Sequence, residues 1–172
     1  MQNSVSSPIP AAGAAVAGTS GGRGVWVYAV AATIRREWFG RADGIGARPV
    51  WAITGRGGPV AGGLAAAVSG VSLDEFGPEA LAARTRRERA IRAHHHVIGI
   101  VSAHLPVVPM PLATVFPDET AVIRMLATRR AEFTATLLNI AAAAAAMGAA
   151  TEGDIPPYAT PSISPRPAMA LG

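Results

Sequence analysis

The stretch Val25-Trp26-Val27-Tyr28-Ala29-Val30 gives the first indication of how this 172-residue chain folds. It is rich in β-branched and aromatic side chains, which is typical of a β-strand. Val50–Thr54 is a second, shorter stretch of this kind, and the glycines at 55–58 tolerate the positive φ angles that a hairpin turn requires. Val60–Val71 predicts a third strand. The first part of the chain therefore predicts three consecutive strands.

A long helix is predicted after the third strand. Ser72-Leu73-Asp74-Glu75 has the form of a capping box, and Pro78 suits the first turn of a helix. From there to about His104 an apolar stripe, interrupted by one histidine, repeats at spacings of three and four. The stripe consists of Ile91, His94, Ile98, Val101 and Leu105. Pro106 is expected to end this helix.

A fourth strand and a final helix follow. Val107–Ala113 predicts the strand, which carries Pro109 and Pro111. Because proline has no N–H to donate to a neighbouring strand, we expect this strand at an edge of the sheet. Asp118 is placed to cap the final helix, with Phe116 just before it. The apolar stripe of this helix consists of Val122, Leu126, Phe133, Leu137 and Ile140.

The order of these elements predicts the fold class. Strand, strand, strand, helix, strand, helix indicates an α+β domain with a mixed four-stranded sheet and two helices on one face. The third strand, the long helix and the fourth strand are expected to form a right-handed crossover. We place this domain at residues 23–147. Residues 1–22 and the proline-rich tail 148–172 are predicted to be disordered, because neither buries enough apolar surface to offset the entropy of ordering.

The composition excludes several classes of protein. The chain has no cysteine, which excludes disulfides and thiolate metal sites. The apolar stretch at 140–150 is shorter than the ~20 residues that span a bilayer, and the N-terminal residues lack the features of a secretory signal. We therefore expect a soluble, cytoplasmic protein with no membrane partner. All fifteen cationic residues are arginines, and the net charge of +4 is a small indication of an acidic partner.

No residue pattern indicates an enzyme, a cofactor or a metal site. The run His94-His95-His96 cannot chelate one ion, because consecutive helical residues point about 100° apart. We expect His94 to lie buried with its ring hydrogen-bonded, and its two neighbours to face solvent. The glycine-rich segments match no phosphate-binding loop.

The basic run between Arg84 and Arg92 raises the alternative of a nucleic-acid-binding protein. A nucleic-acid-binding surface would ideally interleave such arginines with aromatic side chains that stack on bases, and none is present between Phe76 and Phe116. A nucleic-acid partner is therefore not expected. A small basic nucleic-acid-binding module is kept as the alternative function, and a ligand-sensing module as a third.

Five segments of the chain together resemble a known family. They are Gly24–Val30, Gly62–Ser69, Arg92–Ile98 with its adjacent histidines, Leu105–Phe116 and Arg129–Phe133. In this order they are similar to the gas vesicle proteins GvpL and GvpF, whose sequences show a double histidine in a helix, a "vlP.r..TvF" strand and an "L..rr.eF...L" helix. The resemblance covers about residues 24–140.

The resemblance implies a cytoplasmic accessory protein of gas vesicle formation. Members of the GvpL/GvpF family are thought to bind the small hydrophobic shell protein and to assist assembly together with other accessory proteins, and they have no established catalytic activity. On this basis we expect the contact surface on the edge strand and the last helix. The expected contact residues are Pro109, Pro111, Phe116, Arg129, Arg130 and Phe133.

Two departures from the family pattern bear on this expectation. The family continues into a second α/β domain, whereas here the chain runs into Ala141–Ala146 and a proline-rich tail. The helix before the histidines is also more polar than usual, at Arg84–Arg89. A truncated, non-functional copy of a family member is therefore another alternative.

Overall fold

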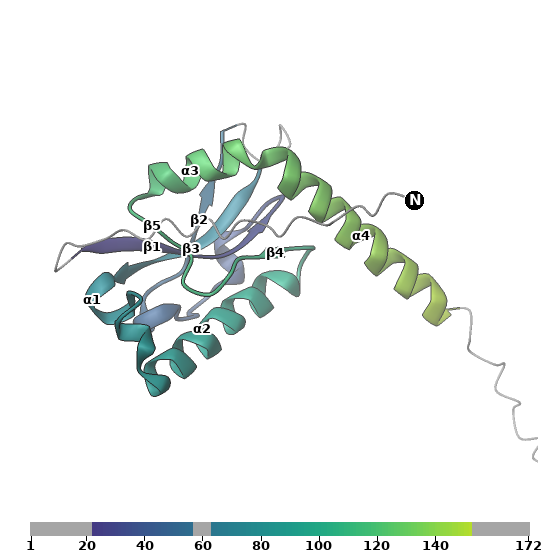
Figure 1. Cartoon of the computed structure of the whole chain (residues 1–172). Coiled ribbons are helices and arrows are strands. Elements are labelled where there is room, and N and C mark those ends of the chain that lie inside the picture. The colour runs from purple at the N-terminus through teal and green to yellow at the C-terminus, as the bar shows by residue number, and fades with distance from the viewer. Residues whose placement is uncertain (1–21, 57–62, 153–172) are drawn as a thin grey trace, which may run out of the picture.

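The computed structural model describes residues 22–56 and 63–152, with side chains described through Gly148 (Figure 1). The segments predicted to be disordered lie outside the described residues, apart from Gly22 and residues 148–152. Residues 57–62, which include half of the predicted hairpin turn and the start of the predicted third strand, also lie outside them.

The sheet is built around its first strand. The strands are β1 (Arg23–Ala31), β2 (Trp51–Thr54), β3 (Ala65–Ser72), β4 (Val108–Pro109) and β5 (Val115–Phe116). The sheet order is β2-β3-β1-β4, and β5 pairs with the other end of β1. All of these ladders are antiparallel, so the predicted mixed sheet is in fact antiparallel between neighbours. The predicted crossover connects β3 and β4, which run parallel to each other with β1 between them.

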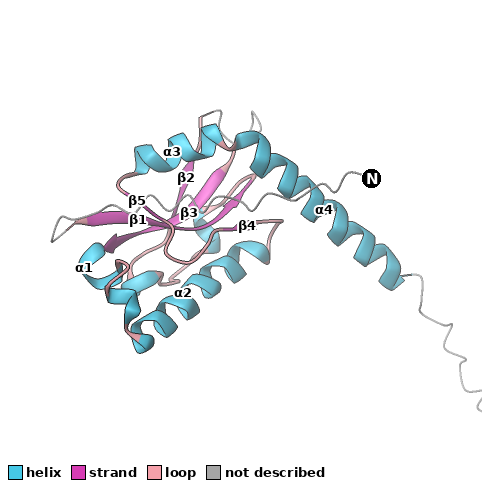
Figure 2. Ribbon diagram, viewed as in Figure 1, coloured by secondary structure: helices cyan, strands magenta, loops and turns pink. Residues whose placement is uncertain are grey.

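Helices cover both faces of this sheet (Figures 1 and 2). They are α1 (Leu73–Phe76), α2 (Arg84–Ser102), α3 (Glu119–Thr128) and α4 (Arg130–Glu152). α2 packs on one face, whereas α3 and the first turns of α4 pack on the other. The α+β class is confirmed, but the prediction of two helices on one face is wrong. The physical reason is that β1 is apolar on both sides, and every residue from Gly24 to Ala31 is buried.

β1 contributes side chains to two separate apolar cores. Trp26 and Tyr28 belong to the core under α2, while Val27 and Val30 belong to the core under α3 and α4. The strand contains a β-bulge at Tyr28, because Val27 pairs with Val68 of β3 and Ala29 pairs with the adjacent Ala67. Tyr28 and Ala29 therefore both contribute to the core under α2.

The long predicted helix begins later than expected, and its buried face only partly matches the predicted stripe, with His94 and Val101 in common. The predicted capping box precedes only the four-residue α1, and the Ser72 side chain makes no capping hydrogen bond. α2 itself begins at Arg84. Its buried residues are Ala90, His94, Val97 and Val101. The aromatic side chains of β1 occupy much of this layer, so small residues such as Ala90 face the sheet where larger ones were predicted.

The last two predicted elements are each divided. Within the predicted strand Val107–Ala113, only β4 pairs with β1. The chain then turns at Pro111, whose carbonyl accepts a hydrogen bond from Thr114 N–H at 3.2 Å. Pairing with β1 resumes at β5. The predicted final helix divides into α3 and α4 at Arg129, where φ is −99° and ψ is 17°. The predicted cap is confirmed, because the Asp118 carboxylate accepts from Ala121 N–H at 2.7 Å.

Candidate functional site

The edge strand β4 carries the first two predicted contact residues. β4 is the last strand on its side of the sheet, as predicted, and both Pro109 and Pro111 are exposed. α4 packs against β4 and β1, so this edge and the last helix form neighbouring parts of one surface. Because proline has no N–H to donate, the edge is a poor template for an added strand and offers mainly apolar side-chain contact.

Arg129 lies at the junction of α3 and α4 and is engaged within the chain. Its Nε and Nη2 donate to the Glu132 carboxylate at 2.8 and 2.5 Å. The guanidinium also lies 4.6 Å from the centroid of the Phe133 ring. The hydrogen bond from Arg129 lowers the pKa of the Glu132 carboxyl below its ordinary value. Arg129 is therefore held in one orientation, partly exposed beside the helix.

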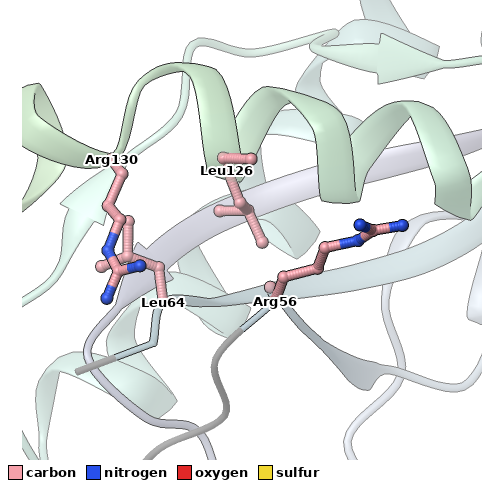
Figure 3. A pocket seen from close by; sticks show the side chains of 6 residues that line it. Arg56, Leu64, Leu126 and Arg130 are labelled. Atoms are coloured by element: carbon pink, nitrogen blue, oxygen red, sulfur yellow. The ribbon is translucent and has the colours of Figure 1, made fainter. Parts of the chain in front are cut away.

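The next residue, Arg130, borders a small hollow between β3, α3 and the end of β2 (Figure 3). Its volume is about 130 Å³, which is well below the roughly 300 Å³ of a typical small-molecule site. The hollow is lined by Gly55, Arg56, Leu64, Leu126, Ala127 and Arg130. Figure 3 shows the two arginine side chains on either side of Leu126. Two arginines thus border this hollow, and Arg56 was not among the predicted residues.

The two predicted aromatic residues lie closer to the core than a contact surface requires. Phe133 is 1% exposed and packs in the core under α4. Phe116, on β5, is half-buried and packs against the same core. Phe133 therefore supports the surface from beneath, because its ring is covered in the folded domain.

His94 is the one buried titratable imidazole among the described residues. Its Nδ1 accepts from Trp26 Nε1–H at 3.0 Å, and its Nε2 lies 2.9 Å from the Met110 carbonyl, to which it donates in the neutral tautomer. Burial lowers the pKa of His94 below the ordinary 6.5. His95 and His96 are exposed, so the predicted arrangement of the three histidines is confirmed. Both nitrogens of His94 are used inside the core, which explains the residue without a metal.

A second, more open hollow lies at the start of α2. Its volume is about 640 Å³, and Arg86 and Arg89 line it together with Phe76 and Glu75. These are the arginines of the predicted basic run. The aromatic ring and the carboxylate beside them come from α1, so the lining is mixed in charge and in polarity.

The sequence analysis did not anticipate how far α4 extends beyond the domain. Residues 141–148 are all exposed, and Leu138 and Met147 are the large apolar side chains most open to solvent in the described part of the chain, at 66% and 72%. By length and composition alone, residues 130–148 are long and apolar enough to cross a membrane. The sequence feature that could have predicted this extension is the polyalanine run Ala141–Ala146, because alanine has high helix propensity.

Comparison with known proteins gives one match. The family model described as "Gas vesicle synthesis protein GvpL/GvpF" matches residues 24–144, from β1 into the exposed part of α4. No curated protein and no solved structure matches the chain.

Proposed function

This chain belongs to the gas vesicle synthesis protein GvpL/GvpF family, and we propose that it binds the hydrophobic shell protein or a sister accessory protein during assembly. Family membership implies a role in gas vesicle synthesis, and the match over residues 24–144 is the observation that carries it. In the proposed role the protein works in the cytoplasm and at the growing gas vesicle, where it keeps its partner competent for assembly.

The physical argument concerns the apolar surface of the partner. A hydrophobic shell subunit aggregates unless its apolar surface is covered. The surface formed by the β4 edge and α4 offers exposed prolines and an exposed apolar helix. Arg130 is the first residue of α4 and lies at the other end of this helix, beside β3 and the end of β2. Protein interfaces commonly combine an apolar centre with a polar rim, and arginine is enriched in them. This arrangement supports the proposal.

We propose that the protein acts by binding, without catalysis. The buried polar side chains that could have served as reactive groups have structural partners. His94 is held between Trp26 and Met110, and the Tyr28 hydroxyl lies 2.5 Å from Ser69 Oγ and accepts from Ile45 N–H at 2.8 Å. These groups hold α2 and the loop after β1 against the sheet.

A retention assay tests the proposed function. The full chain is immobilised and offered the gas vesicle shell protein and each accessory protein at micromolar concentration, with a two-domain family member as the positive control. We expect at least one of these proteins to be retained. Arg130→Glu should weaken retention about fivefold, which corresponds to about 1 kcal/mol for a charge at the rim.

Arg92→Glu is the matched control, because it makes the same change of charge at an exposed site on α2, on the other face of the sheet. It should leave retention unchanged. If the chain retains none of these proteins while the two-domain member does, the chain is not a working assembly factor. That result would favour the truncated, non-functional copy.

A further inference from the structure

The open hollow at the start of α2, of about 640 Å³, is bordered by two arginines. Arg86 and Arg89 lie about one helical turn apart and line it from α2. Its other walls come from α1 and from the loop before β2, and they include Glu75, Phe76, Gly46 and Ala47. We call this space the α2 hollow. It lies on the face of the sheet that α2 covers, opposite to α3 and α4.

The two arginines of the α2 hollow form no ion pair with a carboxylate in the described part of the chain. The ion pairs there join Arg84 to Glu88 and Arg129 to Glu132. Residues 84–92 hold five arginines and a single glutamate, and no acidic residue lies in the first turn of α2. Cations in the first turn of a helix and like charges one turn apart are both unfavourable. A negatively charged ligand would offset this cost.

The loop that forms another wall has an unusual backbone. Ala47 has a φ of 53° and follows Gly46 at 64°, and residues with a Cβ rarely adopt such values. Ala47 N–H donates to the Gly44 carbonyl at 3.2 Å, and Gly44 N–H donates to the Arg48 carbonyl at 2.8 Å. A Cβ on Gly46 would come within 2.8 Å of the Phe76 ring, so the loop packs closely on α1. Such conformations cluster at ligand-binding sites, and the hydrogen bonds hold this wall in place before a ligand arrives.

These walls fit an extended peptide in which acidic and apolar residues alternate. Side chains two positions apart in an extended segment point to the same side, ~6.7 Å from each other. This separation is close to the roughly 5–6 Å between side chains three positions apart on a helix. Two carboxylates of the peptide can therefore face Arg86 and Arg89 together. The apolar side chain between them points away from α2, towards the wall that contains Phe76 and Ala47.

Charge and sequence select a different protein over a second copy of this chain. The net charge is +4, so two copies repel each other. The only acidic residues two positions apart are Glu152 and Asp154, and the residue between them is a glycine. Neither a second copy nor the chain's own C-terminal residues can therefore supply the acidic–apolar–acidic pattern. Glu75 in the lining also disfavours a nucleic-acid strand, because every nucleotide carries a negatively charged phosphate.

We propose that the α2 hollow binds a segment of a partner protein in which acidic residues alternate with apolar ones. Arg86 and Arg89 each donate hydrogen bonds to one carboxylate, and the apolar side chain between the carboxylates covers Phe76. The inference goes beyond the proposed function, because the α2 hollow and the surface of β4 and α4 lie on opposite faces of the sheet. The chain can therefore hold this segment while the other surface is occupied.

Fluorescence anisotropy with the full chain tests this site. The probe is a short rhodamine-labelled peptide that alternates glutamate and leucine, and the control probe has glutamine in place of glutamate. Arg86→Ala combined with Arg89→Ala removes both cations of the α2 hollow. Arg87→Ala combined with Arg92→Ala is the matched control, because it removes the same charge from exposed positions of α2 outside the lining. We expect the first pair to lower the affinity about tenfold or more, and the second to stay within about twofold of wild type.

Several results would overturn the inference. The wild type could fail to bind the glutamate probe, or bind the glutamine probe equally well. Equal losses in the two double variants would show that only the net charge matters. An NMR titration of the unmodified chain avoids the risk that a variant fails to fold: the probe should shift the backbone amides of residues 44–47 and 85–90 most, and largest shifts elsewhere would also refute the site. No gas vesicle protein is present, so these results do not depend on the proposed function.

Other occupants of the α2 hollow would give different results. A wild-type dimer in sedimentation equilibrium that Arg86→Ala with Arg89→Ala converts to monomer would assign the hollow to a second copy. A single-stranded DNA oligonucleotide that binds more tightly than the peptide, and that the same double variant releases, would assign it to nucleic acid. A several-fold gain in peptide affinity on removing residues 153–172 would assign it to the chain's own C-terminal residues. Each of these results would overturn the inference.

Discussion

At the scale of single residues, the core under α2 is held by two buried polar groups on β1. Trp26 donates to His94, and the Tyr28 hydroxyl bridges Ser69 and the backbone of Ile45. Among the described residues no buried side-chain nitrogen or oxygen is left without a hydrogen-bond partner. Because an unpaired buried polar group costs about 1–3 kcal/mol, these contacts fix the orientation of both aromatic side chains. Gly44 belongs to the same cluster, since a Cβ there would clash with the Tyr28 hydroxyl.

His94 gives the first prediction, which concerns pH. Burial holds its pKa in the folded protein below the unfolded value of about 6.5. Between these two values the unfolded chain binds more protons than the folded one, so stability rises with pH in that window. We expect the free energy of unfolding, measured with urea, to be greatest above pH 6.5 and to fall as the pH is lowered through the folded-state pKa.

Two glutamine variants provide the controls for this prediction. Glutamine at 94 can still accept one hydrogen bond and donate another but does not titrate, so His94→Gln should remove the His94 contribution to the pH dependence. His95→Gln changes an exposed neighbour and leaves His94 in place, so this variant should keep most of the His94 contribution. A wild-type pH profile identical to that of His94→Gln would refute the assignment.

At the scale of elements, the two predicted helix caps turned out differently. Asp118 caps α3 through Ala121 N–H, whereas Ser72 makes no capping hydrogen bond before α1. We therefore predict that Asp118→Ala lowers the free energy of unfolding by about 1 kcal/mol, and that Ser72→Ala changes it by less than half as much. Chemical denaturation at pH 7 measures both. Equal losses would show that the capping geometry does not determine the effect.

These elements also show how far local sequence can predict structure. β1 and β2 were predicted to within two residues, because their side chains favour strands wherever they are placed. The start of α2 was not predicted correctly. Residues 73–83 form α1 and a short turn that packs on the start of α2, and this arrangement is set by tertiary contacts. The division of the predicted strand into β4 and β5 likewise depends on β1, which pairs with both pieces.

At the scale of the whole molecule, the sequence indicated the class of fold but not how the helices are distributed over the sheet. The unbroken apolar run in β1 is typical of a strand that is buried on both faces, and that signal could have placed helices on both sides. The overhang of α4 is harder to predict. Leu137 and Met147 belong to the same apolar stripe, and only the position of the sheet edge makes one buried and the other exposed.

The place where the core ends gives a prediction about chain length. A chain that stops after Ala141 loses residues 142–148, which are all exposed, and the residues beyond them. Its thermal midpoint should therefore stay within about 2 °C of that of the full chain. A chain that stops after Glu132 also loses Phe133 and Leu137, whose removal costs about 3–5 and 2–5 kcal/mol. That sum is comparable to the total stability of a typical domain.

Circular dichroism melting of the two shortened chains tests this prediction. We expect a cooperative transition from the longer one and little or none from the shorter one. A shorter chain that melts like the full protein would show that α4 contributes nothing to the core.

The bulge in β1 has an evolutionary consequence. Tyr28 is an extra residue in the ladder with β3, and Ala29 beside it contributes to the same core. Removing Tyr28 would leave the other side chains of β1 alternating between the two cores as they do now. A one-codon deletion of Tyr28 would therefore keep the pairing of β1 with β3. It would cost the core under α2 one ring and the hydroxyl that contacts Ser69 and Ile45.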